Sequence, residues 1–375
     1  MKALILGYGI FLLGFTLFTY LFVDLNLIYM ESFYTGFANH NRELVSIIYV
    51  VFISVFFLFY FFFLRNINQK ILMNLIILSV AFLFLSYPAI LSYDIFNYIF
   101  TAKILVWYQE NPFIVMPIEF LGDPYLSFTH AANKVALYGP SWIGMTILPY
   151  LLGFNNFILT LFNFKLFVVV FYFGIIYLIY KFTKNIGNVA YFALSPLVLI
   201  ETFVSGHNDV SMMFLALLSI YLLKKDKIIL ALFFLFASVL IKYATIFLLP
   251  IFIYYLFLKF KKRKIDWEKI YIFSSLLMFV VFILSPIREE IYPWYGIWFL
   301  TFIAITNNMK LKILGFVLSF GLLLRYVPYM YLGTHFGITP ALKILVTYIP
   351  IIGFLLYLVK DFKNISKKYL RNENK

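Results

Sequence analysis

The sequence lacks cysteine altogether and contains little charge. None of its 375 residues is cysteine, so disulfide bonds and thiolate metal sites are excluded. Only 12% of the residues are charged, whereas 64% are hydrophobic and 22% are aromatic. Soluble globular domains carry about 25% charged residues, and only about half of their residues are apolar. The composition therefore excludes an ordinary soluble protein.

Several short motifs that carry chemistry in other proteins are also absent. The sequence has no glycine-rich phosphate loop, no Asp-x-Asp pair and no Gly-x-Ser-x-Gly segment. No spacing of its histidines and acidic residues is typical of a metal site. We therefore expect no divalent metal ion and no other cofactor.

What the sequence does contain is a series of apolar runs along its whole length. An apolar run of about 20 residues can cross the ~30 Å hydrocarbon core of a bilayer as a helix. The runs are continuous rather than alternating, which favours helices over a β-barrel. We predict about twelve spans, at 3–23, 45–64, 71–91, 158–180, 186–204, 210–223, 228–242, 243–259, 267–286, 294–306, 311–328 and 340–359. The sequence thus predicts an all-α, polytopic transmembrane helical bundle that forms a single domain over residues 1–375.

Basic residues outnumber acidic residues, 30 to 16, and they are unevenly placed. If the N-terminus is cytoplasmic, most of them fall in inner loops, including the cluster at 259–264, and in the basic tail that follows Lys360. Such an excess in cytoplasmic loops is the positive-inside rule. The net charge of +14 therefore orients the protein in the plasma membrane, with both termini inside, and predicts no nucleic-acid partner. The polybasic loop would contact anionic membrane lipids.

The longest segment without an expected span is 92–157, which this topology places outside. The acidic residue Asp94 lies near its start, directly after an apolar run. We expect an interfacial helix over 95–109. Residues 141–154 are also apolar, but a further span there would invert every later basic loop, so we expect an interfacial or re-entrant helix on the outer face.

Most polar residues of this apolar chain gather on the same outer side. Ionisable groups at membrane depth are costly, so their gathering on one side indicates a functional site. They occur in the long loop, at the turn 206–209, at the end of the span 228–242 and after the span 267–286. The candidates are Asp94, Asn111, Tyr138, His207, Asn208, Asp209, Lys242, Arg288 and Tyr292.

Each of these clusters also has a simpler explanation. Asp94 could cap the helix that follows it, and 206–209 has the composition of a turn in which Asp209 caps the next helix. Lys242 could extend to the lipid headgroups, and 288–290 could be a solvated loop. The combination of a carboxylate, an Asn-Asp pair, a lysine and an arginine on one side favours a site.

These residue types can together perform transfer of a sugar from a lipid phosphate. A carboxylate at the outer surface can act as a general base that accepts the proton of a hydroxyl group. Lysine and arginine can neutralise a phosphate. Aromatic rings, which are abundant in 93–108 and 292–299, offer flat surfaces to sugars or isoprenoid chains, although an interfacial belt looks the same.

The order of several short segments resembles a known family. The first outer loop contains Tyr93-Asp94-Ile95-Phe96-Asn97-Tyr98, then Asn111-Pro112-Phe113, then Tyr138-Gly139-Pro140-Ser141-Trp142. Later come Gly206-His207-Asn208-Asp209 and Ile241-Lys242-Tyr243. These segments resemble the GT-C superfamily of membrane glycosyltransferases, and in particular its polyprenyl-phosphate-mannose-dependent mannosyltransferases. The resemblance covers residues 71–260, which leaves two leading spans in 1–70 and further spans with a basic tail in 261–375.

The resemblance implies an inverting transfer of mannose or another hexose from a polyprenyl-phosphate donor at the outer face. Asp94 would be the catalytic base, and Asp209 and Lys242 would line the donor or acceptor site. We expect Lys242 and Arg288 to neutralise the departing phosphate. The substrate-binding candidates are Tyr93, Asn97, Asn111, Tyr138, His207, Asn208, Asp209, Lys242, Tyr243, Arg288 and Tyr292. The acceptor stays open between a glycan, a lipid and a protein.

Two other functions also stay open. A secondary transporter has a similar number of helices, but it shows internal repeats and polar residues near the bilayer midplane. The sequence shows no repeat, and Glu201 is the exception among the acidic residues because it lies within an expected span, near its outer end. A membrane polymerase or ligase of lipid-linked glycans would share the outer polar surface.

Overall fold

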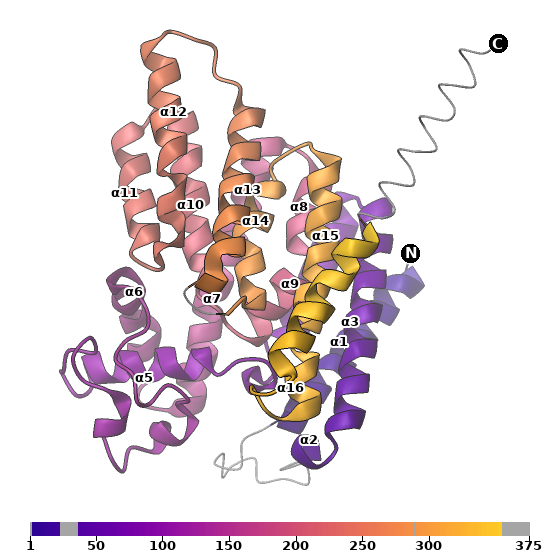
Figure 1. Ribbon diagram of the computed structural model, residues 1–375, viewed down its shortest axis with the longest axis vertical. Helices are drawn as coiled ribbons and strands as arrows, with labels where there is room; N and C mark the ends of the chain where they lie inside the picture. The colour runs from indigo at the N-terminus through magenta and orange to yellow at the C-terminus, as the bar shows by residue number, and fades with distance from the viewer. Residues whose placement is uncertain (1, 23–36, 288–289, 355–375) are drawn as a thin grey trace.

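The computed structural model describes residues 2–22, 37–287 and 290–354. Over these ranges the chain folds into helices and contains no β-strand, so the predicted all-α class is confirmed. Most helices lie alongside one another in an elongated bundle, and the segment with α5 and α6 lies at one end of it (Figure 1). The fold thus has a long helical body and a smaller end unit.

Helices from the whole described chain build the body. Its N-terminal part contains α1 (Lys2–Thr19), α2 (Phe37–His40), α3 (Arg42–Arg65) and α4 (Gln69–Leu83). Its central part contains α7 (Phe157–Thr183), α8 (Ile186–Ala193), α9 (Pro196–Leu199), α10 (Asp209–Lys224), α11 (Ile228–Val239) and α12 (Leu249–Phe260). Its C-terminal part contains α13 (Trp267–Leu284), α14 (Gly296–Ile303), α15 (Met309–Leu324), α16 (Val327–Leu332) and the helix Thr339–Phe354. Apolar side chains of all three parts form one continuous core.

The leading helices are integrated into this body. α1 packs against α4, where the hydroxyl groups of Tyr8 and Ser79 share a buried hydrogen bond of 2.7 Å. α3 packs against α15 and α16, and the Tyr49 hydroxyl donates to the Leu323 carbonyl at 3.0 Å. The bilayer core offers polar groups no water, so hydrogen bonds between helices satisfy them instead. The first contact holds the N-terminal part together, and the second fixes it to the C-terminal part of the body.

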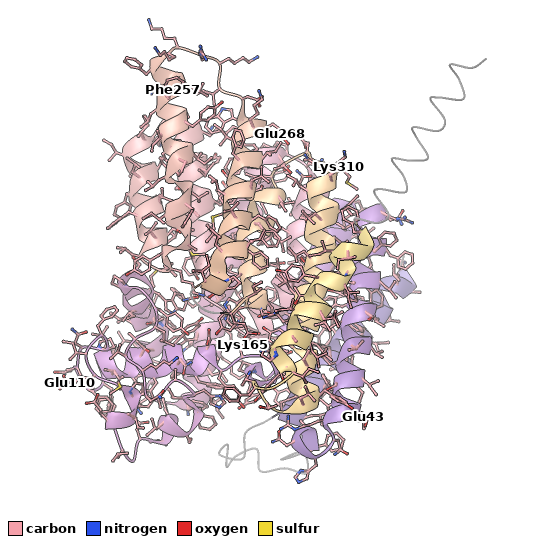
Figure 2. All side chains as sticks on the ribbon, in the orientation of Figure 1. Glu43, Glu110, Lys165, Phe257, Glu268 and Lys310 are labelled. Carbon is pink, nitrogen blue, oxygen red and sulfur yellow. The ribbon has the colours of Figure 1, made fainter. Side chains whose placement is uncertain are left out.

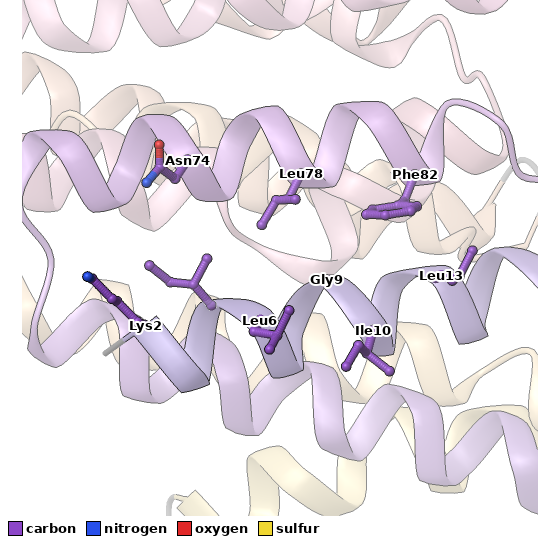
Figure 3. Close-up of a pocket in the computed structure, with 9 residues that line it drawn as sticks. Lys2, Leu6, Gly9, Ile10, Leu13, Asn74, Leu78 and Phe82 are labelled. Carbon is purple, nitrogen blue, oxygen red and sulfur yellow. The ribbon is translucent and has the colours of Figure 1, made fainter.

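A groove of about 460 Å³ runs between α1 and α4 (Figure 3). Its walls are apolar and include Leu6, Leu78 and Phe82, and Lys2 and Asn74 lie together at one of its ends. None of the candidate site residues lines this groove. The groove therefore does not mark the site that the sequence predicts.

The predicted number of about twelve spans is not confirmed. Among the residues that the structure describes, six helices are long and apolar enough to cross a membrane, or seven if one bent pair is a single span. The expected span 294–306 is α14, whose eight residues rise only about 12 Å. All eight are buried inside the bundle. Composition alone cannot separate such a core helix from a spanning one, because both are apolar all round.

The expected span 186–204 is this bent pair. Its two halves, Ile186–Ala193 and Pro196–Val204, meet at an angle of 54°. The break fits the sequence, because Pro196 cannot donate the backbone hydrogen bond that would continue α8. After α9 the chain continues as a π-helix, Ile200–Val204. Short π-helical segments of this kind often occur at functional sites.

Residues 92–157, the expected outer loop, form the end unit. It contains α5 (Asp94–Val106) and α6 (Pro140–Leu151), which pack against each other, so helices are present where the interfacial helices were expected. The unit lies opposite the polybasic loop between α12 and α13 (Figure 1). Figure 2 shows the same arrangement, with Glu110 at one end of the molecule and Phe257 and Glu268 at the other. The side of the membrane on which each end lies stays a prediction.

Candidate active site

The turn 206–209 is the centre of a buried polar cluster. His207, Asn208 and Asp209 are each 0% exposed. The Nδ1 atom of His207 lies 3.6 Å from Oδ2 of Asp94, and Oδ2 of Asp209 accepts a hydrogen bond from Lys242 Nζ at 2.7 Å. The turn thus brings Asp94 from the end unit and Lys242 from the segment after α11 to one place at the junction of the end unit and the body.

The backbone of this turn packs closely against the Ile95 side chain of α5. Gly206 has a φ of +71°, and a Cβ atom on it would lie 2.7 Å from Ile95 Cδ1. A larger residue is therefore disfavoured both by the left-handed conformation and by the lack of space. The backbone N–H of His207 donates to the Glu201 carbonyl at 2.9 Å. The turn therefore lies against α5 at Gly206 and is bonded to the π-helix at His207.

The segment around Tyr138 is tied to the residues just before Lys242. The N–H of Gly139 donates to the Ile241 carbonyl at 3.1 Å, and the N–H of Ser141 donates to the Leu240 carbonyl at 3.2 Å. Tyr138 hydrogen bonds to the Asp94 carboxylate. Burial raises the pKa of Tyr138 well above its usual value of 10, and the Asp94 charge raises it further. Tyr138 therefore stays a hydrogen-bond donor to Asp94 at physiological pH.

Asp94 is the acidic member of this cluster that reaches the surface. Its side chain is 24% exposed, whereas those of His207 and Asp209 are 0% exposed. The capping explanation for Asp94 is wrong, because the N-cap of α5 is Tyr93 and Asp94 is the first helical residue. Asp94 thus connects the molecular surface with the buried groups behind it.

The simpler explanations for Asp209 and Lys242 are also wrong. α10 begins at Asp209, and both carboxylate oxygens of this residue accept hydrogen bonds from side chains rather than capping the helix. Oδ1 accepts from Trp298 Nε1 at 2.6 Å. Lys242 is only 18% exposed and pairs with Asp209, so it does not extend to the lipid headgroups. The two residues form one ion pair at the site.

Aromatic rings form one wall of the cluster. The Trp294 ring stacks on His207 with 3.9 Å between centroids, and the Tyr292 ring stacks on Trp294 at 4.5 Å. Tyr295 stacks on Trp298 at 4.1 Å. Tyr292 was a predicted site residue, whereas Trp294 and Trp298 were not. The density of aromatic residues in 292–299 was the signal that could have identified them.

Other predicted residues have separate surroundings. The Asn111 side chain accepts a hydrogen bond from Phe113 N at 3.0 Å, as in a local turn, and Asn97 accepts from Ala131 N at 3.2 Å. Tyr243 is 62% exposed. Tyr93 stacks on His130, with 3.4 Å between centroids. Arg288 lies outside the described residues. Tyr93 and Tyr243 are thus next to Asp94 and Lys242 in sequence, but their side chains have other surroundings.

The structure adds acidic and basic residues that the predicted set did not include. Glu201 is 0% exposed, and its Oε1 atom accepts a hydrogen bond from the Tyr326 hydroxyl at 2.9 Å. Its Oε2 atom lies 3.4 Å from His207 Nε2. A second cluster contains Arg325 and Lys343, which both contact Oε1 of Glu290, at 2.8 Å and 2.9 Å. A carboxylate within an apolar run was the available signal for Glu201.

The geometry around His207 does not suit a metal ion. Its two carboxylate neighbours face opposite edges of the imidazole ring, so they cannot bind one ion together. Among the residues that the structure describes, no group of three or more histidine and acidic side chains is placed to hold a metal. A reaction without a metal cofactor stays a prediction.

The fold and the site together define an integral membrane protein with a polar site at one end of its helical bundle. Residues 12–258 match the family described as alpha-(1->6)-mannopyranosyltransferase, N-terminal domain. The match covers more than half of the chain, so the protein belongs to this family of GT-C mannosyltransferases and is a membrane glycosyltransferase. The match includes the leading helices, beyond the resemblance predicted over 71–260. No curated protein and no solved structure matches the sequence.

Proposed function

We propose that this protein transfers mannose from a polyprenyl-phosphate donor to an acceptor hydroxyl group at the extracytoplasmic face of the plasma membrane. The observation that carries this proposal is the position of Asp94. Its carboxylate is partly exposed, hydrogen bonds to the buried Tyr138 and lies 3.6 Å from the buried His207. Such a group can reach a substrate hydroxyl while the groups behind it fix its orientation.

In the proposed reaction Asp94 accepts the proton of the acceptor hydroxyl as the acceptor oxygen attacks the anomeric carbon. The bond between that carbon and the phosphate oxygen breaks, and polyprenyl phosphate leaves with the bonding electrons. A single displacement inverts the anomeric configuration. Since the family description specifies an alpha-(1->6) product, the donor would carry a β-linked mannose. The acceptor would then present a primary hydroxyl on the sixth carbon of a sugar.

Two groups of cations support binding of the donor phosphate. Lys242 is partly exposed, but its charge is offset by Asp209. Arg325 and Lys343, which are 5% and 9% exposed, share one oxygen of Glu290. We propose that they contact the donor phosphate together with Lys242 and Arg288, because cations held in a buried place attract a phosphate strongly.

Sugar recognition is proposed for the turn and the aromatic wall. Both polar atoms of the Asn208 carboxamide are buried without a hydrogen-bond partner among the described residues. Buried polar groups without a hydrogen-bond partner are rare in native proteins, so a bound molecule is expected to supply the partner. Hydroxyl groups of the transferred sugar are suitable partners, and the stacked rings of Tyr292 and Trp294 offer it an apolar face. A membrane transporter is a weaker candidate, because family membership indicates transfer of a sugar.

Replacement of Asp94 tests the proposal directly. In the Asp94→Asn variant, size and hydrogen bonding are kept while basicity is lost, so we expect transfer from synthetic polyprenyl-phosphate mannose to fall about 100- to 10,000-fold. The matched control is Asp226→Asn, which alters an exposed carboxylate in the loop after α10. The control should retain the wild-type rate. An Asp94→Asn variant that transfers mannose as fast as the wild type would show that Asp94 is not the base.

A further inference from the structure

His207 lies between two carboxylates, and the proposed transfer uses only Asp94. Its Nδ1 atom is 3.6 Å from Asp94 Oδ2, and its Nε2 atom is 3.4 Å from Glu201 Oε2. Neither ring nitrogen has a nearer hydrogen-bond partner in the described chain, and the ring is fully buried. Stacking by Trp294 at 3.9 Å holds the ring plane. The three side chains therefore form a line that leads from the surface at Asp94 to the interior at Glu201.

Counting protons limits the states that this line can adopt. A neutral imidazole has one N–H group and one lone pair, whereas an imidazolium has two N–H groups. If both carboxylates were ionised and His207 were neutral, a lone pair would face a carboxylate oxygen. This repulsion disappears only when the three side chains hold two protons in all. Either His207 is an imidazolium, or it is neutral and one carboxyl group is protonated.

The surroundings select the second state. Burial lowers the pKa of His207 well below its usual value of 6.5, and the nearby charge of Lys242 lowers it further. The second proton is then held by a carboxyl group. An ionised carboxylate is costlier to bury than a neutral acid. Glu201 is 0% exposed, whereas the Asp94 side chain is 24% exposed. The proton therefore belongs on Glu201, and Asp94 is the ionised member.

We propose that Glu201 is a positioning residue that acts on Asp94 through His207. Protonated Glu201 donates its O–H to Nε2, which fixes the tautomer of His207 with the proton on Nδ1. The Nδ1–H group then points at Asp94 and holds its carboxylate in the orientation that the transfer needs. The proton of the acceptor hydroxyl ends on Asp94, and no proton passes along the line during transfer. This inference rests on the proposed role of Asp94 as the base.

The backbone and the neighbours of Glu201 suit this role. Glu201 lies in the π-helix Ile200–Val204, and its Oε1 atom, which does not face His207, accepts a hydrogen bond from the Tyr326 hydroxyl at 2.9 Å. The titratable groups that face Glu201 from other elements are Tyr49 on α3, Tyr326, His207, Asp94 and Asp209. None of them is a cation. Ionisation of Glu201 is therefore unsupported at neutral pH and would occur only as the pH rises.

The proposal predicts different behaviour for two replacements of Glu201. In Glu201→Gln, the amide oxygen can accept from Tyr326 and the amide N–H can donate to Nε2, as the protonated acid does. We expect kcat at pH 7 to stay within about threefold of the wild type, since the tautomer is kept. In Glu201→Met, no donor remains, and we expect kcat to fall about tenfold or more while KM changes little.

The pH profile separates this role from a merely structural one. Wild-type transfer should decline at alkaline pH, when Glu201 loses its proton and a lone pair of His207 comes to face a carboxylate. This decline should be absent in Glu201→Gln, whose amide does not titrate. If Glu201→Gln is as inactive as Glu201→Met, Glu201 acts as a charge and the proposal is wrong. If Glu201→Met keeps full activity, Glu201 does not position Asp94.

A measurement that does not depend on activity distinguishes failure of this inference from failure of the proposed function. We would record ¹⁵N NMR spectra of a variant in which His40, His130 and His335 are replaced by Gln, so that His207 is the remaining histidine. The expected spectrum shows a neutral imidazole protonated at Nδ1. Protonation at Nε2, or at both nitrogens, would overturn the inference even if Asp94 is the base. The expected tautomer in a protein that does not transfer mannose would overturn the proposed function alone.

Discussion

Two buried Lys–Asp pairs in this protein have nearly the same geometry and very different surroundings. In the end unit, Lys103 Nζ lies 2.6 Å from Asp123 Oδ2. At the candidate site, Lys242 Nζ lies 2.7 Å from Asp209 Oδ2. The geometry of an ion pair therefore does not by itself distinguish a structural pair from a functional one.

The surroundings of Lys103 and Asp123 are closed. Asp123 also accepts hydrogen bonds from the Tyr108 hydroxyl at 2.6 Å and from Tyr125 N at 2.8 Å. Lys103 Nζ lies 3.8 Å from the centroid of the Tyr125 ring, a distance typical of a cation–π contact. The two side chains are 5% and 2% exposed. A pair that is buried and fully bonded in this way stabilises the end unit and leaves no group available to a substrate.

The surroundings of Lys242 and Asp209 are open. Lys242 is 18% exposed, and the neighbouring residues Asn208 and Ser211 have buried polar atoms without hydrogen-bond partners among the residues that the structure describes. Native proteins leave few buried polar groups without partners, so a concentration of them needs an explanation. Substrate binding supplies one. The contrast indicates that incomplete hydrogen bonding nearby, rather than the ion pair, identifies the site.

The largest effect on stability should come from breaking the closed pair. Lys103→Met leaves the Asp123 charge buried without its cation, and removal of one partner of a buried pair costs about 3–5 kcal/mol. We expect a clearly lower midpoint of thermal unfolding in detergent, and a specific activity of the folded fraction that stays within about twofold of the wild type. A variant that unfolds like the wild type but transfers no mannose would show that this pair belongs to the site. The distinction between a structural pair and a functional pair would then be wrong.

The open pair should show the opposite result when both charges are removed. In the double variant Asp209→Asn with Lys242→Gln, hydrogen-bonding groups of similar size remain, and Asn can still accept from Trp298. We expect the free energy of unfolding to change by less than about 1.5 kcal/mol. Mannose transfer should fall about 100-fold, or ~2.7 kcal/mol in activation free energy. Thermal unfolding and initial transfer rates measure the two effects separately.

The matched control makes the same double replacement in the closed pair, Asp123→Asn with Lys103→Gln. This control also removes one buried positive and one buried negative charge, but it lies in the end unit. We expect transfer within about twofold of the wild type. Equal loss of transfer in both double variants would mean that the two pairs do not differ in function.

The fold was predictable where apolar runs are long and uninterrupted. α3, α7 and α13 lie close to their expected ranges, because continuous apolar sequence of this length has few alternatives in a bilayer. α14 was mistaken for a span because a helix buried in protein is as apolar as one buried in lipid. The break at Pro196 was missed because proline is tolerated in many membrane helices and does not fix a bend.

The site was predictable to the extent that residue type and membrane side are informative. The predicted residues Asp94, His207 and Lys242 are brought together by the structure, although their roles stay proposals. Glu201 was left out because nothing in the sequence shows that an imidazole faces it. Arg325 is not in the predicted set, because its contact with Glu290 joins residues that are far apart in the chain. Such contacts depend on how helices pack, and a single sequence does not specify this.

The smallest predicted effect tests the connection between the two regions. Gly139 lies where the end unit meets the segment before Lys242, and a Cβ atom on it would lie 2.0 Å from the Leu240 carbonyl oxygen. Gly139→Ala must therefore separate the two backbones slightly and move Lys242 relative to Asp94. We expect mannose transfer to fall about tenfold, or ~1.4 kcal/mol.

Gly144→Ala is the matched control for this last variant, because Gly144 lies on α6 in the same unit and a Cβ atom there would have nothing within 4 Å. The control should transfer at the wild-type rate, and alanine's higher helix propensity should raise the stability by about 0.5–1 kcal/mol. Initial rates of both variants with the same donor decide the question. If Gly139→Ala is as active as Gly144→Ala, the register between the end unit and the body does not matter for transfer, and the closed and open pairs work independently of each other.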